Sequence, residues 1–141
     1  MNTLFYVRFG GALLGMMVLI CPGAARDGKA RSRFAGSYTG KYVAYRLNAD
    51  SRQEGIDTTT IDGEGKVGGE ATNTTLNQTI KLTGSIDEDG RVKMIYEFPD
   101  ATYTGTGTYS KTRNGTIIGT LIQWSGMRPT AMIELELTPK R

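Results

Sequence analysis

Tyrosine is the residue type in this sequence best suited to form a binding site, because the chain has no histidine and one cysteine, Cys21. Five tyrosines occupy positions that the strand pattern described below assigns to an interior. A buried phenol needs a hydrogen-bond partner, so several phenols facing one interior can line a cavity with aromatic faces and polar tips. These five are Tyr38, Tyr42, Tyr96, Tyr103 and Tyr109.

The same composition excludes most catalytic chemistry. With Cys21 in a segment expected to be removed, the mature chain has no Ser-His-Asp triad, no cysteine nucleophile and no His or Cys metal ligand. Catalysis by carboxylates alone would need two acids facing one cleft. The strand acids Glu70, Glu97, Glu134 and Glu136 alternate with apolar residues and are expected to point outward. We therefore predict a protein that is not an enzyme and uses no cofactor or metal.

Three evenly spaced glycines indicate the elements that hold the tyrosines. Gly65, Gly90 and Gly115 recur every 25 residues, and each ends a turn containing Asp or Asn. Such turns supply the positive φ that a β-hairpin needs. Between them, apolar and polar residues alternate with the period of two that is typical of strands. The predicted strands are 36–46, 56–62, 66–72, 79–87, 91–98, 101–109, 116–124 and 131–138.

The alternation predicts the fold class. In 91–98, Val92, Met94 and Tyr96 share one face and charged residues occupy the other. Charges opposite the apolar face argue against an outer-membrane barrel, whose apolar residues point outward. We predict an all-β fold, a single up-and-down antiparallel barrel of about eight short strands, with a two-sheet β-sandwich as the alternative. The register of 116–124 stays open because this strand is apolar on both faces.

Inward positions of the predicted strands also include several glycines. They either let strands coil tightly at barrel corners or leave room for a ligand. These are Gly40, Gly69, Gly84, Gly105 and Gly107.

The amino-terminal residues 1–25 have the pattern of a signal peptide. Arg8 precedes an uncharged run, 9–20, and small residues lead up to Ala25. The run of about 12 residues is short of the roughly 20 that span a bilayer, so no membrane span is expected in the mature chain. We predict secretion or periplasmic export after cleavage near Ala25, with lipidation at Cys21 as the alternative.

Two further regions complete the predicted organisation. Residues 26–33 read as a flexible basic leader, and 34–141 as the barrel domain. The formal charge of +3 is small and shows no clustered basic face, so no nucleic-acid partner is expected.

Strand direction predicts where a binding site opens. Alternating directions bring the three glycine turns to one end and the longer connections to the other, where binding residues tend to lie on a rigid scaffold. We expect a small aromatic or amphipathic molecule there, with Arg46 meeting an anionic group or, alternatively, extending into solvent. The candidate ligand-binding residues are Tyr42, Arg46, Tyr96, Phe98, Tyr103 and Trp124.

A second function from another class is also open. The loops 47–55 and 125–129 could present the barrel to a protein partner, as in an exported inhibitor or an envelope component. The inferred barrel is similar in outline to the avidin and lipocalin architectures. That similarity concerns layout alone, and no site residue is carried over from either.

Overall fold

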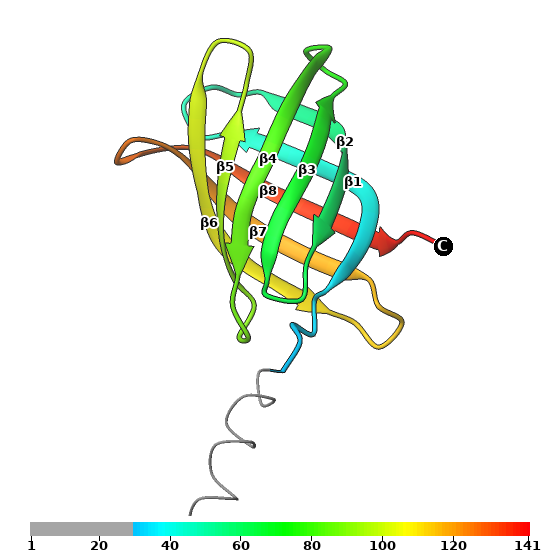
Figure 1. Ribbon diagram of the computed structural model, residues 1–141. Coiled ribbons are helices and arrows are strands. Elements are labelled where there is room, and N and C mark those ends of the chain that lie inside the picture. Colours follow the sequence, from blue (N-terminus) through cyan, green and yellow to red (C-terminus); the bar gives the residue numbers. More distant parts are fainter. Residues whose placement is uncertain (1–29) are drawn as a thin grey trace, which may run out of the picture. The chain divides into compact units, whose positions relative to one another are not determined.

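Residues 31–141 form one compact unit, an eight-stranded closed barrel (Figure 1). The structure is a computed structural model, and it describes residues 30–141. The predicted signal peptide, residues 1–25, lies outside the described residues. The strands are β1 (Gly36–Arg46), β2 (Arg52–Ile61), β3 (Lys66–Asn73), β4 (Gln78–Ile86), β5 (Arg91–Glu97), β6 (Thr102–Lys111), β7 (Ile117–Ser125) and β8 (Arg128–Pro139).

Each strand pairs antiparallel with the next, and β8 pairs with β1 to close the sheet. The predicted single up-and-down barrel is therefore confirmed, and the two-sheet sandwich is not formed. Closure leaves no exposed sheet edge. No helix that could cross a membrane is present among residues 30–141.

The glycine turns form as predicted. In the β2–β3 turn, the Asp62 carboxylate accepts hydrogen bonds from the backbone N–H groups of Glu64 (2.8 Å) and Lys66 (2.9 Å). The β4–β5 turn repeats this arrangement around Asp87. Gly65 has φ +87° and Gly90 has φ +86°, values that side-chain-bearing residues rarely adopt. These turns lie with the β6–β7 turn at one end of the barrel, the lower end in Figure 1.

This lower end is closed by the segment that precedes β1. Phe34 is fully buried, and the guanidinium of Arg33 lies 4.6 Å from the centre of its ring. The Tyr38 hydroxyl donates to the Phe34 carbonyl oxygen (2.7 Å), and Lys111 Nζ donates to the same hydroxyl (3.1 Å). The backbone N–H of Ser32 donates a hydrogen bond to the carbonyl oxygen of Gly63 in the β2–β3 turn (2.9 Å). Of the basic leader predicted over 26–33, residues 32 and 33 thus make contacts with the barrel.

Apolar side chains fill the half of the interior next to this plug. They come from every strand except β6 and are almost completely inaccessible to solvent. The largest contributors besides Phe34 and Tyr38 are Ile61, Val67, Ile86, Val92, Ile117, Leu121 and Leu137. None of these seven lines the cavity described below. The packed core therefore occupies the closed half of the barrel and leaves the other half for a different use.

Two predicted boundaries are wrong at the opposite end. The predicted loop 47–55 is shorter, because β2 begins at Arg52 and pairs back to Tyr45. The predicted loop 125–129 is reduced to a turn, since β7 ends at Ser125 and β8 begins at Arg128. The inward positions at the start of β2 are Gln53 and Gly55, so no apolar alternation marks this end of the strand.

The register of β7, which the sequence left open, is settled by its pairing. Ile117 and Leu121 are fully buried, whereas Ile118 is half exposed on the outer face. A register shift in the pairing with β8 follows between Gln123 and Trp124.

Candidate functional site

The open half of the barrel contains a cavity of about 200 Å³. Its walls come from all eight strands, and residues of the β3–β4 and β5–β6 connections lie at its rim. A cavity of about 150 Å³ lined by apolar side chains holds one benzene molecule. The space is therefore large enough for a ligand with a single aromatic ring.

Five of the six predicted site residues line this cavity: Tyr42, Arg46, Tyr96, Phe98 and Tyr103. Tyr96 and Tyr103 are direct partners across the β5–β6 ladder. Phe98 meets Tyr103 edge to face, with ring centroids 5.3 Å apart and an interplanar angle of 80°. Arg46 is exposed at the open end, so it can act on a ligand at the rim.

Trp124, the sixth, does not line the cavity. Its indole lies on the outer surface, where Nε1 donates to the Thr106 hydroxyl (3.0 Å). Gln123 takes the inward position instead and lines the cavity. The prediction for Trp124 was wrong because β7 is apolar on both faces. The alternation of apolar and polar residues therefore could not show which side chains of β7 point into the barrel.

Three tyrosine rings lie over glycines of neighbouring strands. A Cβ built on Gly55 would stand 2.4 Å from a ring carbon of Tyr42, and one on Gly105 would stand 2.5 Å from a ring carbon of Tyr96. Tyr109 covers Gly119 in the same way, at 2.6 Å. These glycines make room for aromatic rings against the inner wall.

The inward glycines noted in the sequence therefore have two uses. At four of them a Cβ would come within 2.2 Å of a backbone oxygen of the adjacent strand, which is the close approach expected where strands coil at barrel corners. These four are Gly40, Gly69, Gly84 and Gly107. The fifth, Gly105, accommodates the Tyr96 ring instead.

The Tyr42 hydroxyl is a buried polar group without a partner. Among the described residues, it is the one buried side-chain oxygen or nitrogen that makes no hydrogen bond. Burial raises the pKa of this phenol to about 12, and the negative charge of Asp57 adds to the effect. A buried donor left unsatisfied costs about 1–3 kcal/mol, so this hydroxyl is a natural contact for a bound molecule.

Asp57 is the residue that the sequence analysis missed. It is 6% exposed and is the deepest residue of β2 that lines the cavity. Its carboxylate accepts one side-chain hydrogen bond, from the Thr59 hydroxyl at 2.5 Å. Burial raises the pKa of this carboxyl from its ordinary 3.8 to about 6, while the bond from Thr59 acts in the opposite direction.

The charge of this carboxylate affects three phenols of the cavity. Burial is the main cause that raises the pKa values of Tyr96 and Tyr109, and the charge of Asp57 contributes to both, as it does for Tyr42. Tyr109 was assigned to the interior from the sequence but was not named as a site residue. The floor of the cavity thus combines one acid with several phenol groups.

Two amide side chains of the cavity wall, Asn73 and Gln123, already have hydrogen-bond partners. Asn73 donates its amide to the Gln53 side-chain oxygen (2.9 Å) and accepts from the backbone N–H of Leu76 (2.9 Å). Gln123 donates its amide to the Thr130 hydroxyl (3.2 Å). These amides fix the cavity wall, whereas Tyr42 and Asp57 keep bonding capacity for a ligand.

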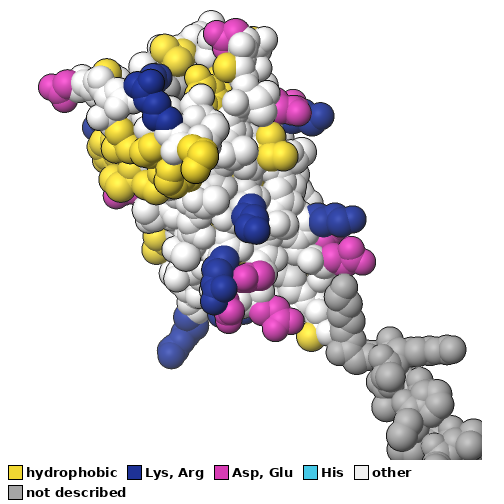
Figure 2. All heavy atoms as spheres, turned by 90° about the vertical axis from the view of Figure 1, so that its left-hand side faces the viewer, with side chains coloured by type: hydrophobic (Ala, Val, Ile, Leu, Met, Phe, Trp, Pro, Cys, Tyr) yellow, Lys and Arg dark blue, Asp and Glu magenta, His cyan; other side chains and the backbone are white. Residues whose placement is uncertain are grey.

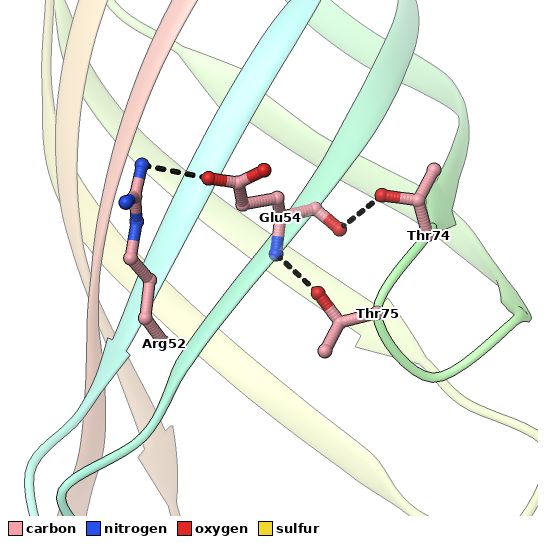
Figure 3. Close-up of polar contacts among 4 residues, drawn as sticks. All are labelled: Arg52, Glu54, Thr74 and Thr75. Atoms are coloured by element: carbon pink, nitrogen blue, oxygen red, sulfur yellow. Dashed lines mark hydrogen bonds and ion pairs between the residues drawn. The ribbon is translucent and has the colours of Figure 1, made fainter.

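The rim beside β2 is held by hydrogen bonds from the β3–β4 turn (Figure 3). The hydroxyl of Thr74 donates to the Glu54 carbonyl oxygen (3.0 Å), and the Glu54 N–H donates to the Thr75 hydroxyl (2.9 Å). Arg52 pairs with the exposed Glu54 carboxylate on the outside of the strand (2.7 Å). The turn brings Leu76 to the cavity.

No family model, curated protein or solved structure matches this chain. A carboxylate and an unpaired phenol at the floor of an aromatic-lined space can orient a polar group of a small molecule. No group of three or more His, Cys, Asp or Glu side chains in the described part of the chain is placed to hold a metal ion.

Proposed function

We propose that this chain is an exported β-barrel protein that binds a small aromatic or amphipathic molecule in its open half, without catalysing a reaction. The observation that carries the proposal is the division of the interior. The closed half is filled by apolar side chains, while the open half keeps a cavity of about 200 Å³ with an unpartnered buried hydroxyl on Tyr42. Stability alone favours filled interiors and paired polar groups.

A blocking substitution tests this proposal. Ala44 is 7% exposed and lines the cavity near its open end, so Ala44→Phe places a ring in the ligand space. Val43 precedes Ala44 in β1 and faces outward, which makes Val43→Phe a matched control. Native mass spectrometry of the protein from its own host should show a bound small molecule in the control but not in Ala44→Phe. Equal retention of the molecule by both variants would contradict the proposal.

Export is part of the same proposal. We expect the protein in a secreted or periplasmic fraction, with an intact mass that corresponds to a chain beginning at Arg26. A mass that retains Cys21 with attached lipid would support the lipoprotein alternative. The full uncleaved mass in a cytoplasmic fraction would contradict export.

A second candidate function, a protein-interaction module, is favoured by the outer surface. Figure 2 shows apolar side chains gathered near one end of the face from which the β7–β8 hairpin projects. Met127 in this hairpin turn is 96% exposed, and Ile122 pairs with Met132 on the outer face. An exposed apolar patch of this kind can mark a protein contact.

Substitution outside the cavity separates the two functions. If the barrel binds a protein through this patch, Met127→Glu should abolish binding of a purified partner, while Ala44→Phe should leave it unchanged. The reverse pattern would exclude this surface as the functional one.

A further inference from the structure

The cavity contains a negative charge, that of Asp57, which no cationic side chain among residues 30–141 neutralises. The titratable cavity groups whose pKa values the charge of Asp57 raises are Tyr42 from β1, Tyr96 from β5 and Tyr109 from β6. Its partner on β3 is Ala71, which does not titrate. The four ion pairs formed among the described residues lie on the surface and do not involve Asp57. A buried charge in a protein is usually paired.

In the described part of the chain, Arg46 is the one cationic residue that lines the cavity, and it lies at the open end, away from Asp57. Asp57 pairs with Gly40 across the β1–β2 ladder, six residues before Arg46 in β1. At about 3.3 Å per residue, the two levels are about 20 Å apart along the strand. Arg46 is also exposed to solvent. It therefore cannot serve as the counter-ion of the carboxylate at the floor.

Asp57 and Tyr42, at the floor of the cavity, both have hydrogen-bonding capacity that a ligand could use. A carboxylate can accept about four hydrogen bonds, and among side chains Asp57 accepts one, from Thr59. The Tyr42 hydroxyl makes no hydrogen bond to any described residue. An ammonium group carries three N–H donors. It could therefore donate hydrogen bonds to an Asp57 carboxylate oxygen and to the Tyr42 hydroxyl oxygen, and its positive charge would neutralise the carboxylate.

The aromatic walls favour the same kind of ligand. Tyr42, Tyr96 and Tyr109 are held against the inner wall over their glycines, and all three line the cavity. The faces of aromatic rings attract cations, and more strongly where both groups are shielded from water. An anionic group at this depth would instead be repelled by Asp57.

Resting on the proposed ligand-binding function, we propose that the ligand is a small organic amine whose ammonium group binds between Asp57 and the Tyr42 hydroxyl. Its apolar or aromatic body fills the cavity toward Phe98 and Tyr103. The volume of about 200 Å³ limits the body to about one ring with a short chain. A ligand anion, if one is present, belongs at the rim beside Arg46.

Three probes that differ in one functional group test the charge preference. They are 2-phenylethylamine, 2-phenylethanol and phenylacetate, titrated by calorimetry into protein purified from expression of the complete sequence. At pH 7.5 the amine should bind at least tenfold more tightly than the alcohol, and phenylacetate should bind most weakly. Amine affinity should fall about tenfold per pH unit below about pH 6, because Asp57 then becomes neutral.

A matched pair of substitutions assigns the effect to one carboxylate. Asp57→Asn should weaken amine binding at least tenfold, remove its pH dependence, and change alcohol binding less than threefold. Asp50→Asn makes the same chemical change in the exposed β1–β2 connection, outside the cavity lining, and should leave amine affinity within threefold. If Asp57→Asn fails to fold, the pH dependence of the wild-type protein still decides the question.

The outcomes also separate this inference from the proposed function. Equal binding of amine and alcohol, insensitive to Asp57→Asn and to pH, would overturn the amine proposal and leave ligand binding intact. Tighter binding of phenylacetate would overturn it as well. No binding of any probe, together with no small molecule bound to the protein from its host, would overturn both.

Discussion

Tyr42 and Gly55 are direct partners across the β1–β2 ladder, and the Tyr42 ring occupies the space where a side chain at position 55 would begin. The same relationship recurs between Tyr109 and Gly119, which are partners in the β6–β7 ladder, and between Tyr96 and Gly105 on neighbouring strands. Glycine and tyrosine therefore act as pairs in this barrel. The glycine keeps the ring against the wall, and the cavity remains open in front of it.

Adding one methyl group at such a pair should push the ring into the cavity. In Gly105→Ala the new Cβ would meet Tyr96 ring atoms at 2.5 Å and 3.0 Å and its hydroxyl at 2.8 Å. Overpacking of this kind costs about 1–3 kcal/mol. We expect urea denaturation to show a loss of that size, together with weaker ligand binding.

Gly68→Ala is the control for this change. Gly68 is also a strand glycine, but a Cβ there has no neighbour within 4 Å. Alanine in place of glycine should leave stability unchanged or raise it by about 0.5 kcal/mol through the unfolded chain. Equal losses in both variants would show that the glycine–tyrosine contact is not the cause.

Two tyrosines at different depths should respond in opposite ways to removal of the hydroxyl. Tyr38 donates to the Phe34 carbonyl oxygen and accepts from Lys111, so Tyr38→Phe should lower the free energy of unfolding by about 1–2 kcal/mol. Tyr42→Phe removes an unpaired hydroxyl and should raise it by about 1 kcal/mol. Chemical denaturation without ligand measures both. A destabilised Tyr42→Phe would mean that the hydroxyl has a partner in solution.

The fold could be predicted because most strands show one clean apolar face. In β5 and β8 the inward residues are apolar and most of the outward ones are charged, so the alternation alone indicated which face points inward, despite the outward Ile95 and Met132. The Asp-Gly turns fixed where the chain reverses. The exact start of β2 could not be found, because its inward positions Gln53, Gly55 and Asp57 are not apolar.

The lack of apolar residues at the inward positions of β2 also explains why Asp57 was not predicted as a site residue. Asp57 shares parity with the buried Ile61, and counting back from Ile61 would have placed it inside. Its neighbour Ile56 is apolar, so the sequence pattern alone would place Ile56 inside and Asp57 outside. In the structure Ile56 is instead half exposed on the outer face. Where a strand lines a cavity, the apolar pattern that reveals the fold is replaced by the polar groups that serve the ligand.

The plug at the closed end should carry much of the stability. Phe34 is completely buried between the glycine turn at Gly90 and the start of β1, so Phe34→Ala should cost about 3–5 kcal/mol. Phe98→Ala is the matched control, since Phe98 is only partly buried at the open end. It should cost less stability and reduce ligand binding instead. Urea titration and calorimetry of both variants distinguish the two roles.

Asp57 should make the barrel less stable at neutral pH than at mildly acidic pH. Its pKa is about 6 in the folded chain and about 3.8 when unfolded, so the folded state holds the proton more tightly. The stabilising contribution of protonation is complete below about pH 3.8 and is lost as pH rises through about 6. The gap between the two pKa values corresponds to about 3 kcal/mol.

Asp57→Asn isolates this contribution from every other titrating group, because asparagine is neutral at all pH values and close in size to the protonated acid. The variant should be more stable than wild type by up to about 3 kcal/mol at pH 7.5, and the advantage should disappear near pH 4.

Asp62→Asn should behave in the opposite way. Backbone hydrogen bonds, first of all that from Lys66, lower the Asp62 pKa, so its stabilising effect is present at neutral pH and is lost on acidification. Urea titrations at several pH values measure both variants. A stability difference between wild type and Asp57→Asn that does not change from pH 4 to pH 7.5 would show that the buried carboxyl does not titrate in this range. Saturating amine should in turn reduce the advantage of Asp57→Asn at pH 7.5, because the ligand supplies the positive charge that the empty cavity lacks.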